Sequence, residues 1–538
     1  MKRVFAMLLS AAMLLSLLAG CAPDLDAYVP TGDGLTWDEG YTGPAQTHPH
    51  EETQELTLTY YPNRSMNPLV SADYTNRVLF SLLYQGLFAV DSKSQPHPIL
   101  CKEYHVSEDM QTYHIYLESA SFSDGRQLTA TDVVASYQAA RESSYYGGRF
   151  THIREITATR RDCVTFYLDT PMEDLPCLLD IPILKASQVA AEQPLGSGPY
   201  WLDNSGKHAM LRRRENWWCK ATVAATATAI GLLEATNPTQ IRDNFEMFDL
   251  DIVCTDPGSD HYADYRCDFE LWDCETGIFL YLLCNMNSLV FSEPQVRAAL
   301  TYAIDRDSIA KSEYQGFGQS ATLPASPTWA HYNQALADRY KYDGTGDTLK
   351  NAIENAGLSG ASVTLLVNSD DSKRTRVAQT VAQALTDAGL VVTVNACEYE
   401  DFRSVLRNRN FDLCLAQTKL SPNMDLGEFF SADGSLSYGS IYNDHLYDLC
   451  NEALANHGNY YTLHQTVMND GRICPILFYS YAVYATRGLI TGLAPARDNV
   501  FFYSLGKDMA DIKLEEVKPT APPETTAPET TAPPETTE

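Results

Sequence analysis

Hydrophobic and polar residues alternate, or recur at helical spacing, through most of this chain. Residues 56–60 and 113–117 alternate with the period of two that is typical of half-buried strands. The stretch SFSDGRQLTATDVVASYQ at 121–138 contains an Asp-Gly turn dipeptide, and then Thr129 and Asp132 at the spacing of a helix capping box. Apolar residues follow at helical spacing. This part of the sequence therefore predicts a strand, a tight turn and a capped helix.

Later segments place strands and helices in alternation. Two strand patterns at 363–367 and 391–394 flank an amphipathic helical pattern at 373–389, and a strand–helix–strand unit predicts that its two strands run parallel. Residues 75–89 and 293–309 are each predicted to form one helix. The predicted fold class is mixed α/β, with at least two lobes.

The N-terminus has the pattern of a secretory signal. Lys2 and Arg3 precede a short apolar run that ends in Leu-Ala-Gly-Cys, with the cysteine at position 21. This ending resembles a bacterial lipobox, which implies that Cys21 is lipidated and becomes the mature N-terminus. A plain signal peptide with an incidental cysteine is the alternative.

Low-complexity segments flank the body of the chain. Residues 21–53 are rich in Gly, Pro, Thr and acidic residues and are predicted to form a flexible tether, and residues 516–538 form a Pro/Thr/Glu-rich tail. His48 and His50, which precede two glutamates, could hold a metal ion. A flexible segment fixes no ligand geometry, so we interpret them as part of a solvated linker. No metal site and no cofactor are predicted.

The net charge and the cysteine spacing argue against two classes of protein, nucleic-acid-binding proteins and zinc modules. The 538 residues carry a net charge of −30, which argues against nucleic acid because a phosphate-binding surface needs a basic patch. None of the thirteen cysteines has zinc-module spacing. Several lie in apolar runs and are expected to be small buried hydrophobes. Cys267 and Cys274 are the first pair to test for a disulfide.

The stretch SFSDGRQLTATDVVASY resembles the signature segment of extracellular solute-binding proteins of ABC importers, the peptide/nickel type called family 5, whose usual pattern is close to "kFsDGtpltAeDVvfSy". The resemblance extends over roughly residues 55–510. Further segments agree with the family in order: Asn67-Pro68-Leu69 with LYQGL at 83–87, PLGSGPY at 194–200, VRAALTYAIDR at 296–306 and the strand at 477–485.

The resemblance implies a two-lobe, periplasmic-binding-protein-like fold of type II, with an extra subdomain in the first lobe and a ligand enclosed between the lobes. The expected boundaries are a signal peptide at 1–20, a tether at 21–53, lobe I at 54–77 with 196–283 and 486–515, the extra subdomain at 78–195, lobe II at 284–485 and the tail at 516–538.

The same resemblance implies a lipid-anchored binding protein on the extracytoplasmic face of the bacterial cell membrane. It would act as a monomer, capture a peptide-like or other small solute, and deliver it to ABC permease subunits. A ligand-binding sensor or adhesin lobe that is not coupled to import is the alternative. A secreted hydrolase is a weaker alternative, since neither the Gly-x-Ser-x-Gly motif nor the His-Glu-x-x-His motif occurs.

The expected ligand site departs from the family pattern at 418–426. Peptide-binding members carry a "gW.aDy.dP" loop whose first aspartate holds a peptide's amino terminus, and here the Trp is missing and only the second acidic position, Asp425, remains. Lys419 favours a ligand with an anionic group, or is a solvated surface lysine. The family's cleft loops give these candidate ligand residues: Arg64, Ser65, Asn67, Lys419, Asn423, Asp425, Tyr438 and Tyr479. Asn285 and Asn287 are the candidate hinge.

Overall fold

The fold is built around one long mixed sheet that passes through both lobes of the protein. The computed structural model describes residues 55–71, 74–219, 225, 227–257, 265–486, 490–491, 497–498 and 506–507. The strand order of the main sheet is β15-β14-β16-β12-β17-β11-β1-β10-β9-β8, with β13 paired to β17. Its strands are β1 (Glu55–Tyr60), β8 (Tyr200–Asp203), β9 (Met210–Arg213), β10 (Ala229–Glu234), β11 (Ile252–Thr255), β12 (Phe269–Cys284), β13 (Gly318–Ser320), β14 (Ser362–Asn368), β15 (Val391–Cys397), β16 (Leu413–Lys419) and β17 (Ile473–Thr486).

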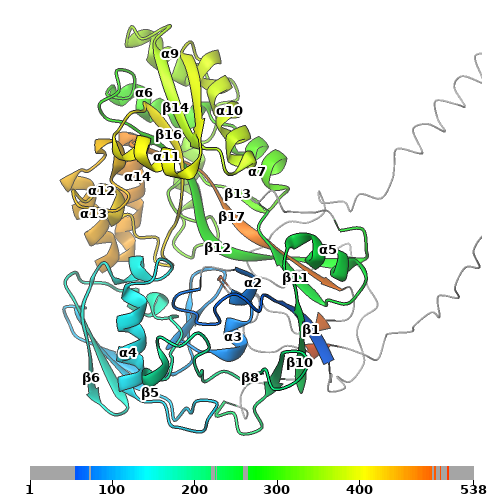
Figure 1. Ribbon diagram of the computed structural model, residues 1–538. Coiled ribbons are helices and arrows are strands. Elements are labelled where there is room, and N and C mark those ends of the chain that lie inside the picture. Colours follow the sequence, from blue (N-terminus) through cyan, green and yellow to red (C-terminus); the bar gives the residue numbers. More distant parts are fainter. Residues whose placement is uncertain are drawn as a thin grey trace, which may run out of the picture.

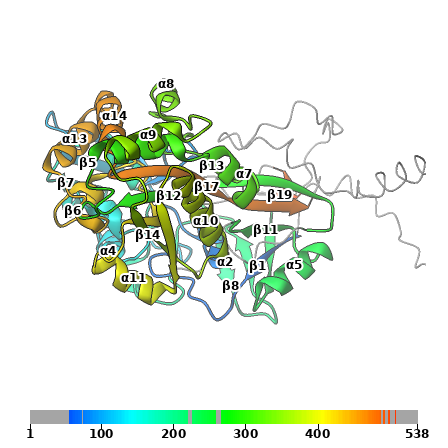
Figure 2. The same ribbon diagram turned by 90° about the horizontal axis from the view of Figure 1, so that it is seen from above.

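Two long antiparallel strands, β12 and β17, connect the lobes. Their first-lobe halves pair from Phe269 with Thr486 to Cys274 with Tyr481, and their second-lobe halves pair from Ile278 with Tyr479 onward. Figure 1 shows both strands running from the lower lobe, which contains β1, β10 and β8, to the upper lobe, which contains β14 and β16. Figure 2 shows the same two strands as the central axis of the molecule seen from above.

Helices cover the sheet in the second lobe. The predicted strand–helix–strand unit is confirmed, because β14 and β15 pair in parallel on either side of a long helix in the chain, α10 (Ser372–Asp387). The remaining second-lobe helices are α6 (Pro294–Leu300), α7 (Arg306–Tyr314), α8 (Gln334–Ala337), α9 (Asp347–Asn355), α11 (Tyr399–Arg407), α12 (Gly427–Phe430), α13 (Asp444–Ala455) and α14 (Tyr460–Asp470), and the first lobe adds α5 (Pro238–Glu246).

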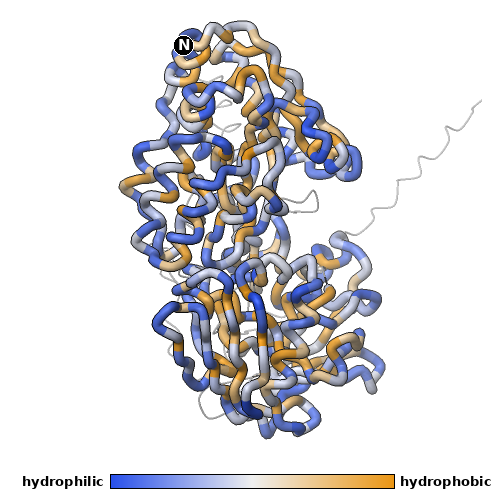
Figure 3. The backbone as a smooth tube through the Cα atoms, turned by 90° about the vertical axis from the view of Figure 1, so that its left-hand side faces the viewer, coloured by the Kyte–Doolittle hydropathy of each residue, from blue (hydrophilic) through white to orange (hydrophobic). Residues whose placement is uncertain are grey.

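Side chains of β12 alternate between two separate cores. Leu280 and Leu282 face the core that includes α10, whereas Phe279 and Tyr281 face the core that includes α12 and α13. Because successive strand residues point to opposite faces, a strand buried on both faces reads as an unbroken apolar run. Figure 3 shows that hydrophobic segments accordingly run through both lobes.

The extra subdomain of the first lobe is a four-stranded sheet, in the order β4-β5-β7-β6, with a capped helix against it. The backbone N–H of Thr129 donates to Asp132 Oδ2 over 3.0 Å, so the predicted capping box is confirmed at the start of α4 (Ala130–Arg141). The elements are β2 (Phe88–Val90), β3 (Pro96–Pro98), β4 (Cys101–Val106), β5 (Thr112–Leu117), β6 (Ile153–Arg160), β7 (Cys163–Leu168) and α4.

Two predicted single helices are wrong. Residues 75–89 form two short helices, α2 (Tyr74–Arg77) and α3 (Phe80–Leu83), before the chain enters β2. The predicted helix at 293–309 is α6 and α7 with a 3-10 turn between them. Apolar side chains at 78–84 are almost all buried, and such an apolar run does not distinguish one long helix from shorter elements. In the second segment Asp305 caps a new helix, because its Oδ1 accepts from the backbone N–H of Ser308 over 3.1 Å.

The twelve cysteines among the described residues are free thiols, so Cys267 and Cys274 are not bridged. No helix in the described part of the chain has the length and apolar character needed to cross a membrane. The predicted signal peptide, Cys21, the predicted tether and the C-terminal tail lie outside the described residues, as does most of the expected 486–515 part of lobe I.

Candidate functional site

The two connecting strands have an irregular point where they pass from one lobe to the other. Their pairing shifts register between Cys274 and Ile278, and Gly277 has a positive φ of 69°. Thr276 Oγ1 donates to the carbonyl of Tyr479 over 2.6 Å, and Glu275 Oε1 accepts from the Gly277 N–H over 2.9 Å. The irregularity therefore has its own hydrogen bonds and brings the Glu275 carboxyl into the junction between the lobes.

Lys419 ends strand β16 at this junction. Its Nζ donates to Tyr145 Oη over 2.7 Å and forms an ion pair with Asp498. Burial lowers the pKa of Lys419 to about 8, against the opposing effect of Asp498. The side chain is 28% exposed, so the structure places Lys419 in an interface between distant segments and not on the open surface.

Arg77 connects this interface to the first lobe. Its guanidinium carbon lies 3.4 Å from the centre of the Tyr145 ring, and Nη2 donates to Tyr146 Oη over 3.0 Å. Nη1 donates to the carbonyls of Pro68 and Ser71 over 3.3 and 2.8 Å. The loop after β1, Arg77, Tyr145 and Lys419 thus form one continuous set of contacts.

Further charged side chains surround these contacts. The buried Arg497 donates to the carbonyl of Leu420 over 2.6 Å and lies 3.8 Å from Glu275. Burial raises the pKa of Glu275 to about 7, although Arg497 opposes the shift. Arg149 pairs with Asp180. We call this group the junction cluster, in which four basic side chains face three carboxyl groups: Arg77, Arg149, Lys419 and Arg497, with Asp180, Glu275 and Asp498.

A cavity of about 110 Å³ lies against the junction cluster and is lined by Arg77, Arg149, Asp180, Arg497 and Asp498 together with aromatic and apolar residues. Gln85 also lines it, and its buried Nε2 has no hydrogen-bond partner among the described residues. Ligand pockets commonly measure about 300–1,000 Å³. The cavity is therefore too small for a peptide-sized solute, and its lining residues belong to the first lobe and its extra subdomain.

The lobes also meet along a rim away from the junction. His152 Nε2 lies 3.1 Å from Asp425 Oδ2, and Thr151 Oγ1 donates to Glu428 over 3.3 Å. The backbone N–H of Glu173 donates to the carbonyl of Leu454 over 2.9 Å. These contacts join the extra subdomain to the α12–α14 region, as Figure 1 shows at the left.

The three predicted residues after β1 lie together. Asn67 is buried, and its Nδ2 donates to the carbonyls of Val189 and Ala191 over 2.9 Å each. Ser65 Oγ accepts from the Asn67 N–H over 3.1 Å, and Arg64 is exposed. The Asn67 side chain thus holds the loop to residues 189–191, and Arg77 connects the loop to the junction cluster.

The other predicted residues are spread over the second lobe. Asn423 and Tyr479 are buried, and the Tyr479 ring stacks on Tyr314 with centroids 5.0 Å apart. Tyr438 packs against the core that contains Tyr281. Asn285 Nδ2 donates to the carbonyls of Arg409 and Phe411 over 3.0 and 2.6 Å, and Asn287 donates to Ser440 Oγ over 3.2 Å. Both predicted hinge residues therefore bond within lobe II, whereas the irregular crossing of the strands lies at Glu275–Gly277.

Sequence reasoning identified Lys419 and Asp425 but missed the residues they contact across the lobes. Tyr145, Arg149 and His152 follow α4, and Arg497 and Asp498 lie near the end of the described chain. They have no common motif or spacing, so no local signal connects them to Lys419. The resemblance assigned residues 121–138 to packing, and the segment just after it contributes Arg149 to the junction cluster and Tyr145, which accepts from Lys419.

Comparisons with known proteins agree with this architecture. The family model described as bacterial extracellular solute-binding proteins, family 5 (middle), matches residues 95–435. The glutathione-binding protein GsiB of Shigella flexneri serotype 5b is 24% identical over 364 residues, which are 62% of this chain and 68% of that protein.

Solved structures are similar at lower identity. The ABC transporter substrate-binding protein CtaP from Listeria monocytogenes has a TM-score of 0.68 at 17% identity, over 82% of this chain and 96% of that one. The periplasmic binding protein DppA from Helicobacter pylori, in complex with the peptide STSA, has a TM-score of 0.61 at 18% identity, over 85% and 98%. These likenesses support the two-lobe fold.

Proposed function

The chain belongs to the bacterial extracellular solute-binding proteins of family 5, which bind solutes and are not enzymes, and from this premise we propose that it captures a small peptide-like solute carrying a carboxylate. The observation that carries the proposal is the excess of basic side chains in the junction cluster. Charge-assisted hydrogen bonds from Arg and Lys to a carboxylate are about twice as strong as neutral ones, and they gain strength away from water.

Three features support an anionic group over a free amine as the recognised end. The 418–426 loop lacks the first aspartate of the peptide-binding pattern, while Lys419 is present. Asp425, the remaining carboxylate, already faces His152. Gln85 adds an unpartnered donor to the cavity wall. Of the candidate ligand residues, Lys419 is therefore the first to test, while Arg64, Ser65, Asn67, Asn423, Tyr438 and Tyr479 stay proposals.

We also propose where the protein lies and how it delivers the solute. A lipid on Cys21 and the tether at 21–53 would hold the protein at the outer face of the cell membrane, where closure of the lobes around the solute precedes its delivery to ABC permease subunits. The protein would act as a monomer. A hinge at Glu275–Gly277 fits this closure better than one at Asn285 and Asn287, because strand pairing is already irregular there.

Mass spectrometry of solute carried through purification tests the class of ligand. We expect a molecule with a carboxylate, recovered unchanged. Calorimetry would then compare one tripeptide in three forms: unmodified, amidated at its C-terminus, and acetylated at its N-terminus. Amidation should weaken binding at least about tenfold, the cost of one charge-assisted hydrogen bond, and acetylation should not. Weaker binding on acetylation and unchanged binding on amidation would overturn the anionic preference. Chemical conversion of the solute would overturn the binding function.

A further inference from the structure

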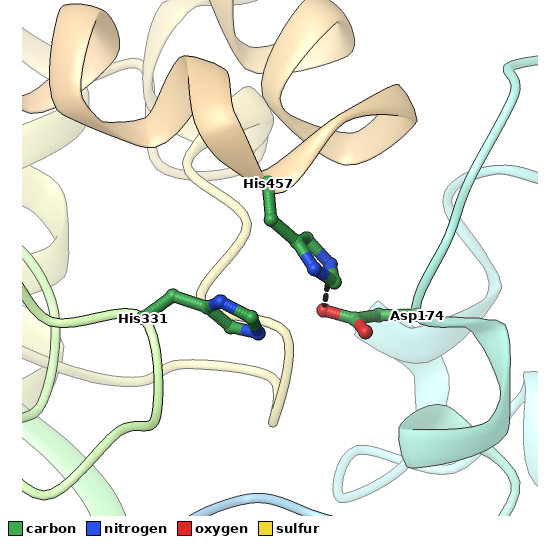
Figure 4. A group of neighbouring side chains, drawn as sticks. All are labelled: Asp174, His331 and His457. Carbon is green, nitrogen blue, oxygen red and sulfur yellow. Dashed lines mark ion pairs between the residues drawn. The ribbon is translucent and has the colours of Figure 1, made fainter.

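Three side chains with metal-binding atoms meet on the rim between the lobes, apart from the junction cluster. Asp174 precedes the 3-10 helix η3 (Leu175–Leu178) of the first lobe. His331 lies in the loop before α8, and His457 begins the 3-10 helix η8 (His457–Asn459) between α13 and α14. One ligand atom from each residue lies within 4.8 Å of the other two. Figure 4 shows the two rings and the carboxylate converging from three separate elements.

The three side chains lie close to one another. His457 Nε2 lies 2.6 Å from Asp174 Oδ2, and the His331 and His457 ring centroids are 4.0 Å apart. The side chains of His457 and Asp174 are 18% and 22% exposed, so the group is partly shielded but open to ions from solvent. In a tetrahedral zinc site the ligand atoms are about 3.4 Å apart, a spacing that small side-chain rotations reach from here.

A fourth residue supplies an outer contact of the kind that metal-binding histidines use. Glu173 Oε2 lies 3.4 Å from His457 Nδ1, the ring nitrogen turned away from Asp174. Carboxylates in this position fix the ring orientation and raise the basicity of the ligating nitrogen.

We propose that Asp174, His331 and His457 bind a divalent transition-metal ion of the zinc type across the two lobes, with Glu173 orienting His457. The donor set of two imidazoles and one carboxylate suits zinc and its neighbours and not magnesium or calcium, which prefer all-oxygen sites. Water would complete the coordination. This site shares no residue with the junction cluster, so the ion acts on the protein itself and is distinct from the captured solute.

The ligands come from both lobes, so a bound ion should affect the equilibrium between open and closed lobes. Asp174 belongs to the first lobe and both histidines to the second, so the full ligand set exists only while the lobes touch at this rim. An ion that binds one of two states shifts the equilibrium toward it in proportion to its differential affinity. Zinc should therefore favour the closed arrangement of the lobes without any solute.

Titration calorimetry of the full-length mature chain with zinc chloride, after chelator treatment and without solute, tests the site. Asp174→Asn, His331→Gln and His457→Gln should each raise the Kd for zinc at least about tenfold, and Glu173→Gln about tenfold. The matched control is His445→Gln, an exposed histidine on α13, which should leave the Kd unchanged. A second control, His48→Gln with His50→Gln, removes the tether histidines and should also change nothing.

Small-angle scattering distinguishes zinc at this site from zinc bound elsewhere, because only an ion that joins the two lobes should lower the radius of gyration. Zinc should lower the radius of gyration of the wild type and of both control variants, but not that of Asp174→Asn, and magnesium should lower none. An unchanged Kd in the three ligand variants, loss of binding in the tether variant, or an unchanged radius with zinc bound would each overturn the proposal. Since no solute is present, none of these results bears on the proposed solute function.

Discussion

His152 and Asp425 join the two lobes through one hydrogen bond, with Nε2 of the histidine 3.1 Å from Oδ2 of the aspartate. Both side chains are largely buried, at 5% and 12% exposure. Asp425 Oδ1 also accepts from the backbone N–H of Gly427 over 2.8 Å. The second acidic position of the altered loop therefore has a partner in the opposite lobe, which couples the contact between the lobes to the charge on a histidine.

The first prediction is that low pH favours the closed arrangement. Burial opposes a charge on His152, but the bond to Asp425 and the nearby Asp169 and Glu428 outweigh it and raise the pKa of His152. A raised histidine pKa stabilises the closed state fully below the ordinary value of about 6.5, and this contribution is lost as pH rises through the raised value. The radius of gyration should therefore grow as pH rises above the ordinary histidine pKa of about 6.5.

His152→Gln should reduce this pH dependence, while His208→Gln, an exposed first-lobe histidine, should leave it intact. His457 forms a second pair across the lobes, and although burial opposes its charge, Asp174 and Glu173 raise its pKa, so a smaller pH dependence should remain in His152→Gln. A chelator keeps metal ions from this second pair during the measurement. A radius that is independent of pH in the wild type, or equally dependent in His152→Gln, would contradict the assignment.

The second prediction concerns the membrane anchor. If Cys21 is lipidated, Cys21→Ser should either release the protein into the medium or leave it unprocessed. Cell fractionation and intact-mass measurement of the mature chain check this, because acyl chains add a defined mass to the N-terminal residue. A mutant that is processed and remains on the membrane as the wild type does would argue for a plain signal peptide.

Local sequence patterns predicted the elements and not the site. The capping box at Thr129 and the parallel pair β14 and β15 depend on neighbouring residues, and both are confirmed. The junction cluster depends on topology: Arg77, Tyr145, Lys419 and Asp498 meet only because β12 and β17 bring the lobes together and the chain then returns to the first lobe.

The failed predictions have a physical cause as well. Residues 75–89 are apolar on several sides because they are buried on several sides, which removes the polar stripe that would set the length of a helix. The hinge expected at Asn285 and Asn287 stays a prediction, while β12 and β17 shift register between Cys274 and Ile278 and again between Leu280 and Tyr281. A register shift depends on the partner strand and leaves no mark in one sequence except an isolated glycine.

The third prediction tests that glycine. At Gly277 the positive φ disfavours any side chain, and an added Cβ would overlap the Arg497 guanidinium and lie 3.0 Å from the Leu420 carbonyl. Gly125, with a φ of 83°, has open space around it. Gly125→Ala should cost about 1 kcal/mol of unfolding free energy, from backbone strain alone. Gly277→Ala should cost about 2 kcal/mol more, from overpacking.

Urea unfolding measures both glycine variants. Scattering should also show an altered radius for Gly277→Ala, because displacement of Arg497 removes its bond to Leu420 at the junction. Equal losses for the two variants would mean that the junction has room for a methyl group and that Gly277 serves the backbone conformation only.

The fourth prediction is that Lys419 carries affinity for an anionic solute. Lys419→Met keeps much of the apolar stem but removes the charge, which should weaken binding of the co-purified solute about tenfold to a hundredfold, as expected for a hydrogen bond to a charged group. Lys350→Met, at an exposed position on α9, is the matched control and should bind as the wild type does.

The pH profile separates a role of the Lys419 charge from a role in packing. Since burial lowers the pKa of Lys419 to about 8, the ammonium form is retained at neutral pH and lost as pH rises through that value. Wild-type affinity should therefore fall above about pH 8. The affinity of Lys419→Met should be low and insensitive to pH over the same range. If the variant is weak but keeps the wild-type pH profile, Lys419 contributes by packing against Tyr145, and the charge that recognises the solute belongs to another member of the junction cluster.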